Sequence, residues 1–209
     1  MDKAFTSKPT LFFFFSIQFL CKIAAKLLFS LEVIGSKNIP NDGACILACN
    51  HISFVDWLLL SSVSPRPIRF VLYFGYYTKS LQWFMNLAQV IPIASKAENK
   101  EIYYSAFDTI SDHLNYNRLV CIFPEGKITT TGEMDTFKHG IEKILKRNLV
   151  PIVPAKLSYT LWGHWSTRSR DKFSPFKRPK VRLVISNVID SEYITANALE
   201  TIIRNIDND

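Results

Sequence analysis

The sequence predicts an α/β fold: a mostly parallel central sheet flanked by helices, with a further helical segment at the N-terminus. Short apolar runs, typical of buried strands, alternate along the chain with longer amphipathic patterns typical of helices. This alternation favours a parallel sheet over an antiparallel one. The 209 residues suffice for one domain with a substantial core, and no internal repeat or low-complexity linker divides them.

The chain opens with an apolar stretch at residues 11–31, which Lys22 and Lys26 interrupt. A membrane-spanning helix needs about twenty nearly unbroken apolar residues. The two lysines are four residues apart and share one helix face, which suits a helix lying in the membrane interface. We therefore expect residues 1–34 to form a membrane-docking helix or helix pair that precedes a domain at 35–209. Spanning stays open, and a signal peptide is the alternative, although no A-x-A cleavage site follows.

The remaining elements follow in order. Strands are expected at residues 44–48, 69–74, 89–93, 119–123, 150–155 and 181–185. Helices are expected from residue 57 onward and at 80–87, 98–116, 136–146 and 191–206. Pro92 predicts an edge strand or a strand end, because proline cannot donate a hydrogen bond to a neighbouring strand.

Charge and cysteine placement narrow the class of partner. The net charge of +7 indicates an anionic partner, such as a membrane surface or a phosphorylated or CoA-type substrate. Nucleic acid ranks last, because no nucleic-acid-binding motif accompanies the charge. All four cysteines lie in apolar runs, which predicts reduced core residues in a domain facing the cytoplasm. No zinc-ligand spacing is present, so we expect no metal site.

The first motif is the stretch 49–56, which follows the apolar run 44–48. Ser53-x-x-Asp56 has the form of a helix start, with Ser53 as N-cap. His51 then lies in the strand-to-helix turn, where the Asp56 carboxylate can reach its ring. Such a pair fixes the imidazole tautomer and leaves the other ring nitrogen to accept a proton, from a substrate hydroxyl in this case. The alternative is a capping box beside an unrelated loop histidine.

The second motif is the stretch 123–132, in which a buried strand ends in Pro-Glu-Gly and a loop with one lysine and three threonines. Backbone amides near Gly126, together with Lys127 and Thr129, are suited to holding a phosphate. A plain turn with a solvated lysine is the alternative, but it does not explain why Glu125 follows a buried strand. His51 and Glu125 are both expected at carboxyl ends of strands, where sites collect in such sheets.

Together these residues resemble the glycerolipid acyltransferase family, which includes the lysophosphatidic acid acyltransferases. Its NHx4D motif matches Asn50, His51 and Asp56, and its FPEG motif matches residues 123–126. A proline-containing motif of the family is similar to residues 150–154. In motif form, the chain looks closest to the acyltransferase region of bacterial 2-acylglycerophosphoethanolamine acyltransferases.

The resemblance implies transfer of a fatty acyl group from acyl-CoA or acyl-carrier protein, as co-substrate, to a lipid hydroxyl without any cofactor. It makes His51 the general base and Asp56 its orienting partner, with direct attack by the bound hydroxyl and no acyl-enzyme. Acceptor binding and positioning are expected from the remaining motif residues: Asn50, Ser53, Lys96, Glu125, Gly126, Lys127 and Thr129.

Departures from the family pattern bear on the acceptor. Phosphatidic-acid-forming members have Thr-Arg after FPEG, where this chain has Lys127 and Ile128, and Lys96 stands where their second motif ends in arginine. Lysine lacks the bidentate fork of arginine, so the pattern leans towards a lysophospholipid with a larger head group. Lysophosphatidate, glycerol phosphate or an amino-acid lipid is the alternative acceptor. A thioesterase or lysophospholipase, or a non-catalytic membrane module, is the alternative class.

One more stretch, at residues 162–182, interleaves aromatic with basic side chains. That composition suits a membrane interface or the surface that receives the acyl donor. The whole predicts a membrane-associated acyltransferase of phospholipid metabolism whose partners are a lipid surface, a thioester donor and a lysophospholipid.

Overall fold

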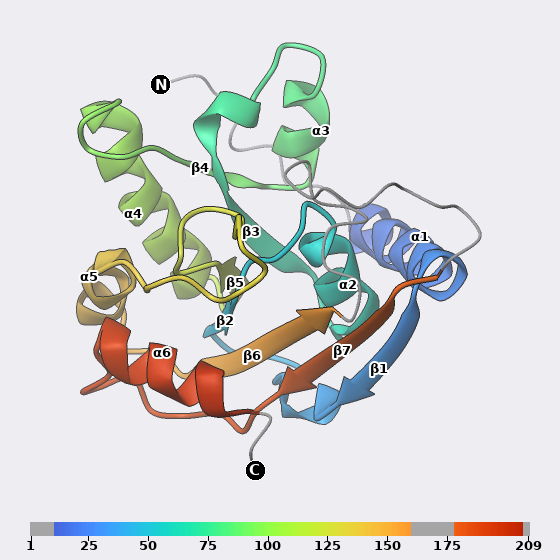
Figure 1. Cartoon of the computed structure of the whole chain (residues 1–209). Coiled ribbons are helices and arrows are strands. Elements are labelled where there is room, and N and C mark those ends of the chain that lie inside the picture. Colours follow the sequence, from blue (N-terminus) through green and yellow to red (C-terminus); the bar gives the residue numbers. More distant parts are fainter. Residues whose placement is uncertain (1–10, 160–177, 207–209) are drawn as a thin grey trace.

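The computed structural model describes residues 11–159 and 178–206 (Figure 1). The strands are β1 (Ser30–Ile34), β2 (Cys45–Cys49), β3 (Ile68–Tyr73), β4 (Ile91–Ile93), β5 (Leu119–Ile122), β6 (Ile152–Tyr159) and β7 (Lys180–Ile185). The α-helices are α1 (Leu11–Leu28), α2 (Asp56–Val63), α3 (Gln82–Leu87), α4 (Lys100–Asn115), α5 (Gly140–Arg147) and α6 (Ala196–Asn205). Two short 3-10 helices are η2 (Ser36–Asn38) and η3 (Phe74–Tyr76).

One sheet contains all seven of these strands, in the order β1-β7-β6-β2-β5-β3-β4. Every pairing is parallel except β6 with β7, which is antiparallel. The predicted α/β fold with a mostly parallel sheet is therefore confirmed. Pro92 lies in β4, an edge strand, as its missing amide hydrogen predicted.

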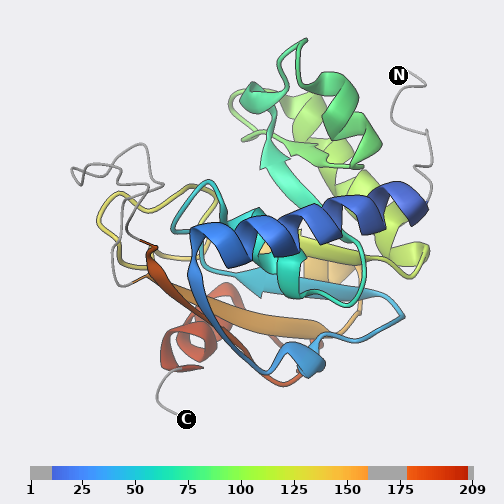
Figure 2. The same cartoon turned by 90° about the vertical axis from the view of Figure 1, so that its right-hand side faces the viewer.

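The sheet is the middle layer of three. Along β2, Cys45, Leu47 and Cys49 pack with apolar residues of α1 and α2. The intervening Ile46 and Ala48 pack on the other face, with residues of α4, α5 and α6. Figure 2 shows α1 and α2 lying together on their side of the sheet. Because helices cover both faces, β2 and β5 are buried along their whole length and read as unbroken apolar runs.

Strand β1 was not among the predicted strands. Residues 30–34 were placed with the membrane-docking segment, and the structure pairs them in parallel with β7 at the sheet edge. Their burial alternates between exposed and half-buried, because an edge strand with one open face lacks the continuous apolar run that marked β2 and β5. The described part of the predicted docking segment thus holds one helix, α1, and one strand.

Helix α1 packs lengthwise against α2 (Figure 2). Its inner face buries Phe14, Gln18, Cys21 and Ala25, at the three- and four-residue spacing of one helix side. At its C-terminal end, the Arg178 guanidinium donates hydrogen bonds to backbone carbonyls of the last turn and of Phe29. Within the described residues, no helix has both the length and the apolar character needed to cross a membrane.

Candidate active site

Three neighbouring strands deliver the site from the same edge of the sheet. His51 follows the carboxyl end of β2, Glu125 follows β5 and Tyr159 ends β6. Since β2 lies between β5 and β6 and pairs with both in parallel, the three residues meet where the strands end (Figure 1). This arrangement confirms the expected placement of His51 and Glu125 at strand ends.

His51 and Asp56 are in direct contact. The imidazole Nδ1 lies 2.8 Å from Asp56 Oδ2. Asp56 is fully buried, whereas the histidine side chain is 19% exposed and stacks on the Phe123 ring at a centroid distance of 4.1 Å. With Nδ1 facing the carboxylate, Nε2 is the ring nitrogen left for a proton from a substrate. The geometry is that of a general base with an orienting carboxylate.

The same carboxylate organises the turn that carries the histidine. Asp56 Oδ2 also accepts hydrogen bonds from the amides of Ile52, at 2.8 Å, and Ser53, at 2.9 Å. The prediction that Ser53 is the N-cap was wrong: α2 begins at Asp56 and Val55 holds the N-cap position. The carboxylate instead reaches back to the turn amides, as the acidic residue of a capping box does. The Asp56 carboxylate therefore accepts from the turn amides, as the capping alternative predicted, and also contacts His51, as the catalytic interpretation predicted.

The backbone of His51 is held from both sides by the loop after β5. Its amide donates to Glu125 Oε1 at 2.6 Å, and its carbonyl accepts from the Thr129 amide at 2.9 Å. Glu125 Oε2 accepts from the Asp135 amide at 2.8 Å, so the buried carboxylate ties the loop to the histidine turn. Burial raises the pKa of Glu125, and the hydrogen bonds from both amides oppose that shift.

Asn50 fixes the turn to the other neighbouring strand. Its side-chain Nδ2 donates to the Leu157 carbonyl at 2.9 Å, and its Oδ1 accepts from the Leu157 amide at 2.7 Å. The side-chain amide thereby continues the β2–β6 pairing beyond Cys49, where the backbone turns away. Both ends of the Asn50 amide are engaged within the protein.

The other predicted site residues are less closely tied to the histidine. Ser53 is buried beside Asp56, and the Thr129 hydroxyl donates to the Glu133 carbonyl at 2.6 Å within the loop. Lys127 forms an ion pair with Asp135 at 2.6 Å. Lys96 lies after β4 at the sheet edge, with its ammonium over the Tyr104 ring. Contacts of these residues with a substrate stay predictions.

Two neighbours of the site were missed by sequence reasoning. Tyr159 donates its hydroxyl to Asp56 Oδ1 at 2.8 Å, across 103 residues of sequence. Lys138 lies against Gly126: a Cβ at that glycine, whose φ is +66°, would come within 2.9 Å of the lysine Nζ. No local pattern marks Tyr159, but a lysine shortly after an FPEG loop was a signal for a second cation beside Lys127.

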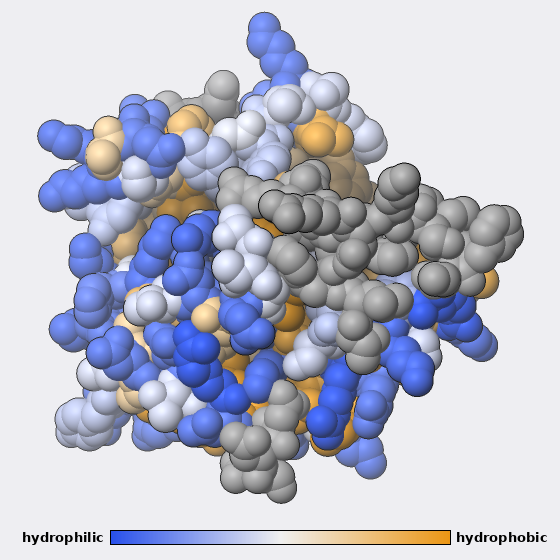
Figure 3. Space-filling view, viewed as in Figure 1, coloured by the Kyte–Doolittle hydropathy of each residue, from blue (hydrophilic) through white to orange (hydrophobic). Residues whose placement is uncertain are grey.

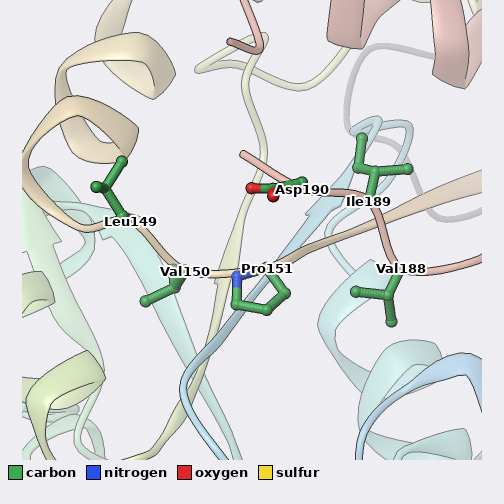
Figure 4. A pocket seen from close by; sticks show the side chains of 6 residues that line it. All are labelled: Leu149, Val150, Pro151, Val188, Ile189 and Asp190. Carbon is green, nitrogen blue, oxygen red and sulfur yellow. The ribbon is translucent and has the colours of Figure 1, made fainter. Parts of the chain in front are cut away.

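An open hollow of about 420 Å³ lies elsewhere (Figure 4). It is lined by Leu149–Pro151, before β6, and by Val188–Asp190, after β7. Because β6 starts at Ile152, the hollow sits at the amino end of that strand, away from His51. It therefore does not belong to the site.

The cysteines near the site show no sign of metal or nucleophilic chemistry. Burial raises the pKa of Cys49 and Cys121 well above the ordinary value of a thiol, and the charge of Asp56 adds to the shift. Both thiols therefore stay protonated and unreactive at neutral pH. The described residues hold no cluster of histidine, cysteine and acidic side chains suited to a metal ion.

Comparison with known proteins places this geometry in a family. Residues 30–158 match the family model described as Acyltransferase. The chain belongs to the acyltransferase family. The match begins at β1 and ends just before Tyr159, so the histidine turn and the loop after β5 both lie inside it.

Individual acyltransferases show the extent of the likeness. The chain is 25% identical to the chloroplastic 1-acyl-sn-glycerol-3-phosphate acyltransferase BAT2 of Brassica napus over 68% of its own length and 42% of that protein. It is 26% identical to the 1-acyl-sn-glycerol-3-phosphate acyltransferase of Bacillus subtilis, over 79% and 78% of the two chains. It thus spans about two fifths of the plant protein's length.

A solved acyltransferase shares the fold. The crystal structure of PlsC, the 1-acyl-sn-glycerophosphate acyltransferase from Thermotoga maritima, superposes with a TM-score of 0.70 at 21% sequence identity. The match covers 93% of this chain and 79% of that one. At 21% identity this similarity shows a shared fold, in which a mostly parallel sheet lies between helical layers.

Proposed function

We propose that this protein is an O-acyltransferase that moves a fatty acyl group from a thioester to the free hydroxyl of a lysoglycerophospholipid. The observation that carries the proposal is the contact between His51 Nδ1 and the buried Asp56 carboxylate, with the histidine side chain partly exposed. Membership of the acyltransferase family supports it.

The chemistry follows from this geometry. His51 Nε2 takes the proton of the acceptor hydroxyl as its oxygen attacks the thioester carbonyl, and Asp56 stabilises the imidazolium that forms. The tetrahedral intermediate then collapses by breaking its carbon–sulfur bond, and the imidazolium returns the proton to the departing thiolate. General-base assistance of this kind contributes about 10²–10⁴-fold to the rate. The acyl group passes directly to the acceptor, which fits the buried, protonated thiols of Cys49 and Cys121.

The acceptor is a glycerophospholipid with one free hydroxyl. The names of the relatives, 1-acyl-sn-glycerol-3-phosphate acyltransferases, support lysophosphatidate. Lys127 follows Gly126 in the loop after β5 and Lys138 lies against that glycine, and these two cations support an acceptor that carries a phosphate. The pairing of Lys127 with Asp135 leaves less net charge there than a doubly charged phosphomonoester favours, which supports a phosphodiester head group as the second candidate.

The surface formed by α1 and α3 docks on a lipid bilayer from the cytoplasmic side. Helix α1 exposes Phe15, Phe19, Leu20 and Leu27, each more than half accessible, on the side turned away from α2. Its N-terminal end meets α3 through a ring contact between Phe13 and Phe84. Trp83 of α3 is 66% exposed, and Lys22 and Lys26 lie exposed among the apolar side chains of α1. Aromatic and apolar groups bordered by lysines suit a membrane interface with anionic lipids. Free, buried cysteines suit the reducing side of that membrane.

The test is an acyl-transfer assay on the purified chain in detergent or mixed vesicles. Labelled acyl-CoA and acyl-carrier protein are offered with lysophosphatidate and with lysophospholipids of larger head group, and His51→Ala is run in parallel. We expect transfer to at least one acceptor, lost in the variant. Transfer by His51→Ala at the wild-type rate would rule out the mechanism.

Water as acceptor is the remaining outcome to separate. Release of free fatty acid at the same rate with and without lysophospholipid would make the protein a thioesterase. The preference among acceptors decides between the phosphomonoester and the larger head group.

A further inference from the structure

Tyr159 meets the catalytic pair from the strand next to β2. Its hydroxyl donates to Asp56 Oδ1 at 2.8 Å, while Oδ2 of the same carboxylate faces His51. The Asn50 side chain grips the backbone of Leu157, two residues earlier on the same side of β6. Asn50, which precedes His51 in the turn, therefore fixes the part of β6 from which the Tyr159 hydroxyl reaches the Asp56 carboxylate.

Towards Asp56 the phenol acts as a hydrogen-bond donor. Burial raises the pKa of Tyr159 well above the ordinary value, and the charge of Asp56 and the hydrogen bond to it raise it further. A protonated phenol beside a buried carboxylate withdraws negative charge from it and restricts its rotation. The two oxygens of Asp56 therefore have different side-chain partners: Oδ1 accepts from the Tyr159 hydroxyl, and Oδ2 faces the His51 imidazole.

We propose that Tyr159 is a positioning residue that lowers the proton affinity of the His51–Asp56 pair and thereby keeps the imidazole available as a base. This inference rests on the proposed acyl transfer for its biological meaning. Without the phenol, the carboxylate carries more negative charge. It then binds a proton more readily itself and also stabilises the imidazolium more strongly. Both effects move proton uptake by the pair to higher pH.

Other titratable groups face Asp56 and must be separated from the pair. Cys49 on β2 and Cys121 on β5 stay neutral, because burial raises the pKa of both thiols. Glu125, in the loop after β5, has a pKa raised by burial and interacts electrostatically with His51. Its titration can enter the acid limb of a rate profile. The decisive readout must therefore report on His51 alone.

The experiment compares Tyr159→Phe with the wild type in the full chain. The Cε1 resonances of ¹³C-labelled histidine are followed with pH, and the His51 signal is assigned with His51→Gln. The profile of kcat/KM against pH is measured beside it. Because loss of the hydrogen bond leaves more negative charge on the carboxylate beside the ring, the His51 midpoint should move to higher pH in the variant. The acid limb of the profile should move in the same direction.

Tyr77→Phe is the control, because its half-buried side chain, after η3, donates its hydroxyl to the Val90 carbonyl at 2.5 Å, just before the edge strand β4 and remote from Asp56. It should lose a comparable hydrogen bond and leave the His51 midpoint unmoved. An unmoved midpoint in Tyr159→Phe, or an equal shift in Tyr77→Phe, would overturn the inference.

A second experiment tests the proposal even if Tyr159→Phe does not fold. Uniform 3-fluorotyrosine makes every phenol a stronger donor and should shift the His51 midpoint down, opposite to Tyr159→Phe. A shift upward or none would contradict the proposal. The histidine titration needs no turnover, so a wild-type protein that transfers no acyl group would refute the proposed function and leave this test standing.

Discussion

The two ends of the parallel sheet bury charge in contrasting ways. At the carboxyl end, Asp56 and Glu125 are buried acids whose oxygens accept hydrogen bonds from turn amides, and the edge of His51 reaches the surface. At the amino end, Arg66 and Arg69 are buried cations. Figure 3 shows hydrophilic side chains over much of the described part of the face seen in Figure 1.

The cations of the amino end bind neutral acceptors. Gln89 Oε1 accepts from Arg69 Nε at 2.8 Å and from Arg118 Nη1 at 3.1 Å, and the same Nη1 lies 2.8 Å from His113 Nδ1. The Arg69 guanidinium also stacks over Phe14 of α1. Among the described residues, Arg69 and Arg118 form no ion pair, and they join chain turns through these neutral partners.

Arg66 is a further buried cation of the amino end, and only part of its guanidinium group is hydrogen-bonded. Its Nη1 donates to the Gly43 and Asn117 carbonyls, while Nε and Nη2 are buried with no partner among the described residues. Gln89 and Asn117 both adopt positive φ, a conformation unfavourable for non-glycine residues. The two ends thus differ in their partners: the buried acids of the carboxyl end hold a partly exposed histidine, whereas the buried cations of the amino end donate to neutral groups of the fold.

The largest expected effect is at the carboxyl end. Asp56→Asn leaves one acceptor oxygen where the carboxylate accepts from two amides and a phenol and orients the imidazole. We expect acyl transfer to fall by about 10²–10⁴-fold, measured as kcat/KM with labelled donor. A circular-dichroism spectrum unlike that of the wild type would show a folding defect, and an unchanged rate in a folded variant would contradict the assigned role.

The amino end should respond to acid. Burial, together with the charges of Arg118 and Arg69, lowers the pKa of His113 to about 4 from 6.5. Between these two pKa values His113 is protonated in the unfolded chain but neutral in the native state. The free energy of unfolding should therefore decrease as the pH falls from about 6.5 to 4, by roughly 3 kcal/mol in total. His113→Gln should flatten this dependence in urea unfolding at several pH values. An equal slope in variant and wild type would contradict the burial of a neutral histidine.

Glu125 should show the opposite sign and a smaller effect. Because its folded pKa lies above 4.5, the native carboxyl holds its proton more tightly than the unfolded chain does. The stability this contributes is complete below pH 4.5 and is lost as pH rises through the folded value. Relative to Glu125→Gln, the melting temperature of the wild type should therefore fall as the pH rises above about 4.5. A rising difference would mean that the pKa is lowered instead.

The smallest effect belongs to the exposed ion pair at the rim. Lys127 and Asp135 are both about half exposed, and such pairs contribute little to stability because solvent screens them. Lys127→Met should leave the melting temperature nearly unchanged and raise KM for the acceptor a few-fold, with kcat preserved. Lys37→Met, in η2, serves as the control for lost charge. An equal change of KM in Lys127→Met and Lys37→Met would mean that Lys127 does not bind the acceptor.

Local sequence was sufficient for much of the fold and for half of the site. The apolar runs of β2 and β5 predicted buried strands, and the spacing of His51 and Asp56 predicted a contact across one turn. Strand β1 was missed because its edge position leaves an alternating, half-exposed pattern. Tyr159 was missed because it reaches the site through the pairing of β6 with β2. Lys138 was missed although it follows the FPEG loop, because only the fold of that loop brings it back to Gly126. The stretch 162–182 lies, apart from residues 178–182, outside the described residues.

We propose that His51 is the general base of acyl transfer and that His113 has a structural role, although each ring nitrogen Nδ1 contacts a charged neighbour. Acyl transfer by His51→Gln and by His113→Gln, measured side by side in variants of unchanged secondary structure, distinguishes the two roles. We expect a loss of about 10²–10⁴-fold in the first variant and the wild-type rate in the second. A full rate in His51→Gln, or an equal loss in both, would contradict it.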